Sequence, residues 1–421
     1  MSKKLSILLV FCVCCAIPKS GWALETTSGI ESQLKQLIQT VNDLKLIVES
    51  QQREIATLKM ARQEAPSVLQ APASRALQGR WNPDIGVVAD TVLLLDSPKE
   101  DEEGADRVSV RELEVVFGSA VDPYSRLDVT LAISDFEEMA LEEAYLTRFG
   151  LPWDLKARVG KFKPRVGKAI PVHRDSLDTV DEPLVIQRWF GVEGYNKSGV
   201  DMSRLLDLPW PVVHEVSFGV LEGGNGEEGT AFGETRRRPT LYSHLKNFLD
   251  IDDVTSLEAG VSHLVGSRDE DASFEVQILG LDGTFIHHFS PTQSIKLQGE
   301  VFYMSREESA FDLEDETTGE IFSEDIDDNR NLWGGYALID LRVHPQWSIG
   351  ARYDDVQLVD GSIAGLERAD RGYTGYVTFY QSEFARWRAQ YNYIDHQDGL
   401  TESQVLIQGT FAIGEHKHKL Q

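Results

Sequence analysis

The stretch that decides the fold runs from residue 331 to residue 413, and its clearest part is Ala-Arg-Trp-Arg-Ala-Gln-Tyr-Asn-Tyr at residues 385–393. Apolar residues occupy every second position there, and arginine, glutamine and asparagine stand between them. Successive side chains of a strand point to opposite faces, so this segment has one apolar face and one polar face. The segments at residues 333–343 and 347–354 alternate in the same way.

Aromatic residues fall near the ends of these apolar faces, at Trp333, Trp347 and Tyr393. Strands of about ten residues with an apolar outer face, a polar inner face and aromatic girdles are typical of transmembrane β-barrels. We therefore predict an all-β transmembrane barrel. A soluble β-sandwich also alternates and is the alternative on periodicity alone.

The same pattern continues through residues 81–421 and predicts sixteen antiparallel strands, an even number, as a closed bacterial barrel requires. The predicted strands are residues 84–95, 108–117, 126–134, 140–149, 154–163, 193–205, 212–221, 240–249, 255–265, 273–285, 294–305, 332–343, 347–356, 373–381, 385–394 and 404–413. Tight turns alternate with long connections, which we expect to face the outside. The long connections are residues 97–107, 164–191, 222–237, 306–330 and 358–371.

The N-terminus predicts export. Lys3 and Lys4 precede an apolar run, and Gly21-Trp22-Ala23 follows it, so residues 1–23 are predicted to be a secretory signal peptide. All three cysteines lie inside this segment, which leaves a mature chain without disulfides or thiolate metal sites. A lipoprotein would need a small residue before its modified cysteine, and the residues here fit poorly. The sequence predicts no membrane-spanning helix.

Residues 24–61 have a different pattern, with apolar residues at alternating spacings of three and four. The pattern predicts a short periplasmic coiled coil, and the additional apolar residues Ile38 and Ile47 widen its stripe and favour three strands. An amphipathic helix packed on the periplasmic end of the barrel is the alternative. Residues 62–80, with Pro66 and Pro72, are predicted to be a linker, and residues 81–421 the outer-membrane barrel.

A basic cluster stands out between residues 155 and 174, where the chain has no acid. Lys156 and Arg158 share the polar face of their strand, so they are expected to point into the lumen. Rings of arginine and lysine select anions in pores. The predicted pore-lining constriction consists of Lys156, Arg158, Lys161, Lys163, Arg165, Lys168 and Arg174. Alternatively, these cations only balance lumenal carboxylates such as Asp90, Asp128, Asp340 and Asp354.

The acidic residues lead to weaker expectations. A formal net charge of −27 argues against a nucleic-acid partner. The loop at residues 306–330 is rich in acids but lacks the glycine and glutamate positions of an EF-hand, so it is predicted to be solvated, with loose divalent bridging to lipopolysaccharide as the alternative.

His416 and His418 are expected to lie on a solvated tail. The sequence predicts no cofactor and no metal site.

Several motifs resemble the phosphate-selective porins O and P: Asn82-Pro83-Asp84-Ile85, Glu142-Glu143-Ala144-Tyr145-Leu146-Thr147, Val159-Gly160-Lys161-Phe162 and Val180-Asp181-Glu182-Pro183-Leu184-Val185. The resemblance spans most of residues 81–421. It implies a sixteen-stranded, usually trimeric outer-membrane channel whose third loop, here residues 164–191, folds into the lumen. The phosphate-selective members carry dense basic ladders, whereas acids alternate with bases along this predicted lumen.

The expected function is a passive outer-membrane channel, a porin, for small hydrophilic solutes, with a weak preference for anions. The alternative is a structural envelope protein whose barrel anchors the periplasmic coiled coil. Neither a G-x-S-x-G motif nor a converging set of nucleophile, base and orienting group is evident in the sequence, so no enzyme is predicted. The expected partners are two further copies of the chain, outer-membrane lipid with lipopolysaccharide, and small ions or solutes.

Overall fold

The computed structural model describes residues 83–97, 106–134, 139–234, 236–268, 274–308, 312–314, 321–323, 328–359 and 369–414. The predicted signal peptide, coiled coil and linker, together with the tail histidines His416 and His418, lie outside the described residues. Within the described part of the chain, no helix is long and apolar enough to cross a membrane.

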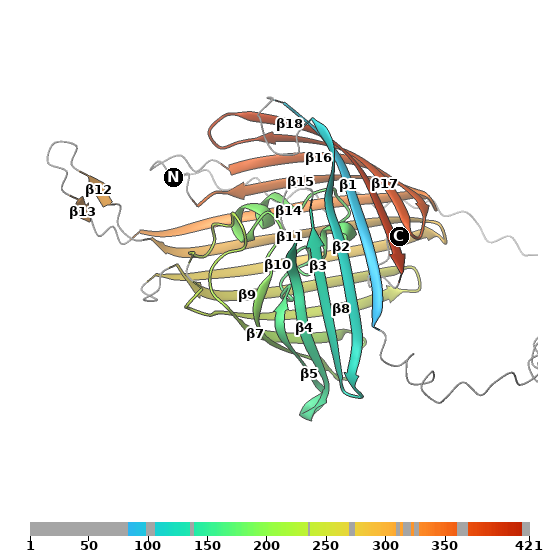
Figure 1. The fold of residues 1–421 in the computed structure, drawn as a ribbon, viewed down its shortest axis with the longest axis horizontal. Coiled ribbons are helices and arrows are strands. Elements are labelled where there is room, and N and C mark those ends of the chain that lie inside the picture. The colour runs from blue at the N-terminus through green and yellow to red at the C-terminus, as the bar shows by residue number, and fades with distance from the viewer. Residues whose placement is uncertain are drawn as a thin grey trace, which may run out of the picture. The chain divides into compact units, whose positions relative to one another are not determined.

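Sixteen antiparallel strands form one closed barrel. Figure 1 shows many of these strands lying side by side around it. Strand β1 pairs with β2 on one side and with β18 on the other, which closes the ring. The prediction of a sixteen-stranded closed barrel is confirmed. In chain order the strands are β1 (Asp84–Ser97), β2 (Arg107–Asp122), β3 (Ser125–Ile133), β4 (Ala140–Leu151), β5 (Leu155–Phe162), β6 (Lys197–Leu206), β7 (Val213–Leu221), β8 (Thr240–Asp252), β9 (Thr255–Ser267), β10 (Glu275–Ser290), β11 (Gln293–Glu308), β14 (Asp328–His344), β15 (Trp347–Gln357), β16 (Ala369–Ser382), β17 (Ala385–Asp395) and β18 (Thr401–Gly414).

Two details differ from the predicted strands. Strand β6 begins at Lys197 rather than at residue 193, because the preceding residues belong to the end of a long loop in which Gly194 has a φ of 81°. The acidic connection between β11 and β14 contains a small hairpin of β12 (Asp312–Glu314) and β13 (Ile321–Ser323).

The outer and inner faces of the barrel have opposite character. On β16 and β17, Val377 and Trp387 are 39% and 43% exposed, whereas the neighbouring Thr378 and Arg388 are buried. An apolar exposed surface around a polar interior is the reverse of a soluble protein and suits a lipid environment. Ile349, Phe379 and Tyr391, which the alternation placed on the lipid face, share this outward side.

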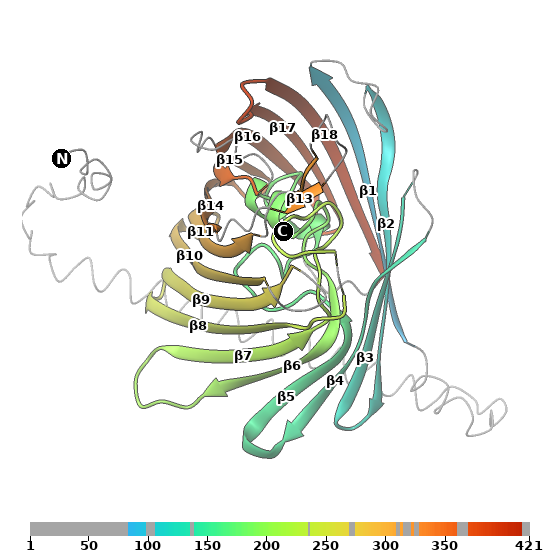
Figure 2. The same ribbon diagram turned by 90° about the vertical axis from the view of Figure 1, so that its left-hand side faces the viewer.

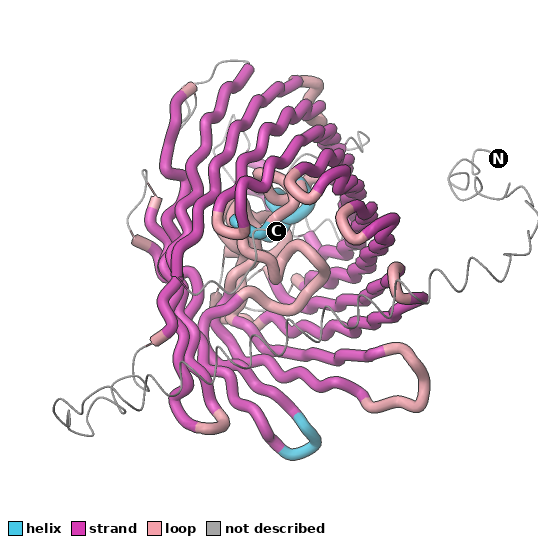
Figure 3. Tube along the Cα trace, turned by 90° about the vertical axis from the view of Figure 1, so that its right-hand side faces the viewer, coloured by secondary structure: helices cyan, strands magenta, loops and turns pink. Residues whose placement is uncertain are grey.

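The connection between β5 and β6, residues 163–196, lies inside the ring of strands, as Figures 2 and 3 show. This inward loop contains the short helices η2 (Arg174–Ser176) and η3 (Ile186–Phe190). A second segment, residues 222–239, joins it through backbone hydrogen bonds, such as that from the Ala231 amide to the Trp189 carbonyl at 2.9 Å. Gly191 ends η3 with a φ of 140°, and a Cβ there would lie 2.9 Å from the Glu227 carbonyl oxygen. Only glycine therefore fits where the two segments meet.

An apolar cluster occupies part of the lumen, which the sequence did not predict. Its largest members, Trp189, Phe190, Tyr195, Phe232 and Phe302, are almost completely buried. The rings of Phe190 and Phe302 meet edge to face, with centroids 5.6 Å apart, so the inward loop packs directly on strand β11. The barrel thus encloses a packed core beside its charged surfaces.

Candidate functional site: the charged lumen and its inward loop

Arginines of the barrel wall hold the inward loop. Arg388 on β17 donates hydrogen bonds to the carbonyl oxygens of Leu177 and Thr179, at 3.0 and 2.7 Å. Arg352 on β15 donates to the carbonyl of Asp181 at 2.8 Å and pairs with the carboxylate of the same residue. These wall arginines are buried, so their positive charge is directed at the loop backbone.

Wall acids and amides bind the loop as well. Glu300 on β11 accepts a 2.6 Å hydrogen bond from the Ala169 amide, and Asp354 on β15 accepts one from the Leu184 amide at 3.0 Å. The Val180 amide donates to the side chain of Gln390 on β17. The loop is therefore fixed to strands β11, β15 and β17, which lie along one arc of the barrel.

The seven cations of the predicted constriction have varied surroundings. Arg158 pairs with the buried Asp201 on β6, and Lys168 with Glu258 on β9. Arg165 lies 3.9 Å from Glu215, and Arg174 lies 3.6 Å from Glu193. Lys163 lies 3.2 Å from Glu142. Lys161 donates to the Leu141 carbonyl, and Lys156 is exposed near the turn between β4 and β5.

A cavity of about 330 Å³ brings three of these seven together with other charges from the wall and the loops. Its basic residues are Lys161, Lys163, Arg174, Lys197 and Arg236, and its acidic residues are Glu112, Glu142, Glu193, Glu222 and Glu227. We call this space the charged cavity. Equal numbers of cations and anions facing one small space create a strong local field with little net charge.

The four lumenal carboxylates named from the sequence have partners of their own. Asp90 pairs with Arg111, Asp128 with Arg126, and Asp354 with Arg352. Asp340 accepts a 3.0 Å hydrogen bond from the hydroxyl of Tyr376. The acids that accompany the basic cluster come instead from β4, β6, β7 and β9, with Glu193 of the inward loop. Which acid meets which base depends on how residues of neighbouring strands are aligned, and that alignment cannot be read from a single sequence.

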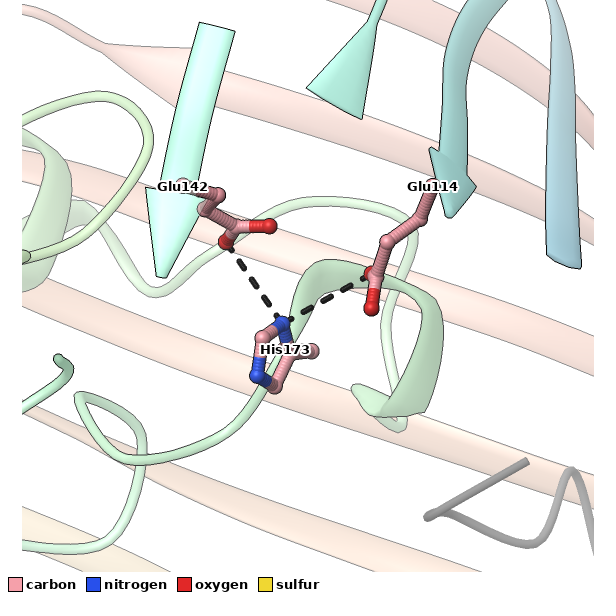
Figure 4. A group of neighbouring side chains, drawn as sticks. All are labelled: Glu114, Glu142 and His173. Carbon is pink, nitrogen blue, oxygen red and sulfur yellow. Dashed lines mark ion pairs between the residues drawn. The ribbon is translucent and has the colours of Figure 1, made fainter. Parts of the chain in front are cut away.

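Sequence reasoning missed a compact group formed by Glu114 on β2, Glu142 on β4 and His173 on the inward loop (Figure 4). Nδ1 of His173 lies 3.6 Å from the Glu114 carboxylate and 3.5 Å from that of Glu142. Nε2 lies 3.1 Å from Glu143. Burial of His173 opposes its protonation, but hydrogen bonds to Glu142 and Glu143 raise its pKa well above the ordinary value.

A β-bulge explains how adjacent acids reach the same histidine. In the pairing of β3 with β4, Thr130 lies opposite Glu143 and Leu131 opposite Leu141, so Glu142 has no partner across the ladder. A bulged residue breaks the strict alternation of faces and can re-aim its side chain. The only signal in the sequence was the adjacent pair Glu142-Glu143 within a predicted strand.

No protein-family model matches the chain. An uncharacterised protein of Aquifex aeolicus is 26% identical over 331 residues, which cover 72% of this chain and 68% of that protein. An anion-selective porin from Comamonas acidovorans superposes with a TM-score of 0.54 at 11% identity, covering 79% of this chain and 99% of that porin. The outer-membrane channel DcaP of Acinetobacter baumannii gives a TM-score of 0.49 at 11% identity, with 79% and 96% covered. The likeness to the Comamonas porin concerns the fold: this chain folds as a porin-type barrel.

Proposed function

We propose that the protein is a passive outer-membrane channel for small hydrophilic solutes, as its resemblance to the phosphate-selective porins O and P suggests. The observation that carries the proposal is the charged cavity, which lies within a closed barrel whose outer face is apolar. A hydrophobic exterior suits lipid, and a polar, charged interior suits water and ions. The inward loop narrows the passage, so only small solutes would cross.

We further propose that Lys161, Lys163 and Arg174 line the narrow part of this passage, with Arg158, Arg165 and Lys168 of the basic cluster near it and Lys156 outside it. Five acids face the five bases of the charged cavity, so the net field is small and any anion preference is weak. Charges at a constriction act on ions more strongly than charges at a wide mouth, where salt screens them within about 8 Å. Single charge changes at the cavity should therefore shift selectivity measurably.

Single-channel recordings across a salt gradient test this proposal. The unmodified protein should conduct, with a reversal potential slightly on the anion side. Lys161→Glu changes the charge inside the cavity and should move the reversal potential towards cations. Lys156→Glu is the matched control, because Lys156 lies on the same strand outside the cavity and is exposed. Equal shifts in both variants would contradict the assignment of Lys161 to the conducting passage.

A second candidate is a structural envelope protein in which the barrel anchors a periplasmic coiled coil. The apolar cluster of the lumen favours it, because a packed core fills space that water would occupy in an open pore. The two candidates differ in conductance. A folded barrel that passes no current in lipid bilayers would favour the structural role.

The proposed setting follows from the channel function. We place the barrel in the outer membrane of a diderm bacterium, with lipid and lipopolysaccharide around it and residues 24–61 in the periplasm. We propose a homotrimer, supported by the apolar stripe that Ile38 and Ile47 widen in the predicted coiled coil.

A further inference from the structure

The group Glu114, Glu142 and His173 unites two barrel strands and the inward loop at one point (Figure 4). One nitrogen or carboxylate oxygen from each residue lies within 4.8 Å of the others. We propose that this group is a binding site for a divalent transition-metal ion of the Zn²⁺ type, which ties the inward loop to the barrel wall.

The distances fit such an ion. A tetrahedron with metal–ligand bonds of about 2.1 Å has edges of about 3.4 Å. Nδ1 of His173 lies 3.6 Å from Oε2 of Glu114 and 3.5 Å from Oε1 of Glu142, so small shifts would bring these atoms around one ion. One imidazole nitrogen and two carboxylate oxygens are a donor set that zinc accepts.

The Glu114 carboxylate supplies further support. It is 4% exposed, and its Oε2 faces Nδ1 of His173 at 3.6 Å. Oε2 of Glu142 is likewise buried and accepts no hydrogen bond from the described part of the chain. Burying a carboxylate without a partner is costly unless a cation or a proton neutralises it. Two largely buried carboxylates thus face one imidazole nitrogen, and an ion bound there would take the place of the proton on His173.

The surroundings orient the histidine as a metal ligand requires. Nε2 of His173 lies 3.1 Å from Glu143, so a carboxylate can hold the ring by the nitrogen that faces away from Glu114 and Glu142. Histidines that bind metals usually have such a partner, which fixes the ring and leaves the other nitrogen for the ion. Glu143 is therefore a positioning residue.

An ion could reach this site, where it would compete with Lys163 for one carboxylate. Glu142 also lines the charged cavity, which gives an ion a path to the site and leaves room for a water or solute as a fourth ligand. Nζ of Lys163 lies 3.2 Å from Oε1 of Glu142 and donates to the Val172 carbonyl. The lysine thus competes with the ion for Oε1, the oxygen that lies 3.5 Å from Nδ1 of His173, whereas Oε2 of the same carboxylate has no hydrogen-bond partner among the described residues.

The test is Zn²⁺ and Co²⁺ binding by the full-length mature protein in detergent, which does not depend on the proposed channel function. All variants are made in a parent protein that carries His416→Gln and His418→Gln, so that the tail histidines cannot bind the ion. We expect the parent protein to keep one Zn²⁺ per chain after dialysis, and its Co²⁺ form to show the visible absorption bands of a four- or five-coordinate ion. His173→Gln and Glu114→Gln should abolish both signals, and Glu143→Gln should weaken binding about 10–100-fold.

His396→Gln is the matched control. His396 also lies between two acids, Asp370 at 3.3 Å and Glu402 at 3.2 Å, but they flank opposite ring nitrogens. This variant should keep full binding. The β-sheet circular dichroism spectrum verifies that each variant is folded, and the near-isosteric Glu114→Gln covers the case in which His173→Gln does not fold. Absence of metal in the parent protein, or retention of one Zn²⁺ by folded Glu114→Gln, would overturn the site.

Discussion

Arg388 donates a 2.7 Å hydrogen bond from Nη1 to the carbonyl oxygen of Thr179, which lies 209 positions earlier in the chain. The guanidinium also donates to the Leu177 carbonyl and to the hydroxyl of Thr378 on the neighbouring strand β16. One buried cation thus connects two barrel strands with the inward loop. The position of that loop depends on such contacts, because its own regular structure is limited to two short helices.

Replacing Arg388 with glutamine should loosen the inward loop. The shorter neutral side chain loses the hydrogen bonds to Leu177 and Thr179, and each bond from a charged group contributes about 1.5–3 kcal/mol. We expect a lower free energy of unfolding in urea and larger fluctuations of the single-channel current. Arg371→Gln is the control, because Arg371 pairs with Asp355 on the exposed surface and should contribute less than about 1 kcal/mol. Equal stability of the two variants would contradict the anchoring role.

The outward face of β16 should tolerate apolar residues and reject charge. Val377 is exposed and pairs with Ile349 and Ala389 on the neighbouring strands. Val377→Arg should lower the free energy of unfolding from lipid vesicles by about 2–4 kcal/mol, as expected for a cation near the middle of the membrane. Val377→Leu should have little effect. A folded mature protein that dissolves without detergent would show that this face does not contact lipid.

The stability of the inward loop should depend on the protonation of Glu182. Burial raises the pKa of this residue from 4.5 to about 7, although Lys163, Arg174 and Arg352 lower it and Asp181 raises it further. The folded state then binds more protons than the unfolded state between these values, so stability falls as the pH rises from about 4.5 to 7. Urea unfolding at a series of pH values should show this slope. Glu182→Gln should remove part of it, and an unchanged slope would contradict the assignment.

The predicted coiled coil gives a prediction about assembly. Leu37 and Leu44 occupy positions of its apolar stripe, and lysine at both should separate the helices while the barrel persists. Gln39→Lys with Asn42→Lys adds the same charge on the polar side and is the control. Native mass spectrometry in detergent should give three chains for the unmodified protein. A monomer or dimer there would be evidence against the trimer.

The barrel was predictable because its signal is local. Alternation around Trp387 and Val377 assigns each side chain to a face without any knowledge of the neighbouring strands. Strand ends were less predictable, since β6 begins only at Lys197, after the inward loop. The apolar packing of Trp189 and Phe190 inside the lumen was not predicted, because apolar residues in a loop have no periodicity that reveals their partners.

The site was predictable only in part. The basic cluster was evident as a run of charge, but Arg158 meets Asp201, which is 43 residues away, and no spacing rule anticipates that pair. Glu114, Glu142 and His173 come from three separate segments, and the bulge at Glu142 breaks the alternation from which the other faces were assigned. Sites assembled across a barrel wall depend on register and on loop placement, which local patterns do not encode.

The contact between β17 and the inward loop also constrains how the protein is made. The loop leaves the ribosome long before Arg388, so Trp189 and Phe190 have no complete barrel to enter until the last strands arrive. Contacts over such sequence separations form slowly, and apolar surface that waits for them is prone to aggregation. We therefore expect variants that loosen the inward loop to fail first during folding, before the last strands close the barrel.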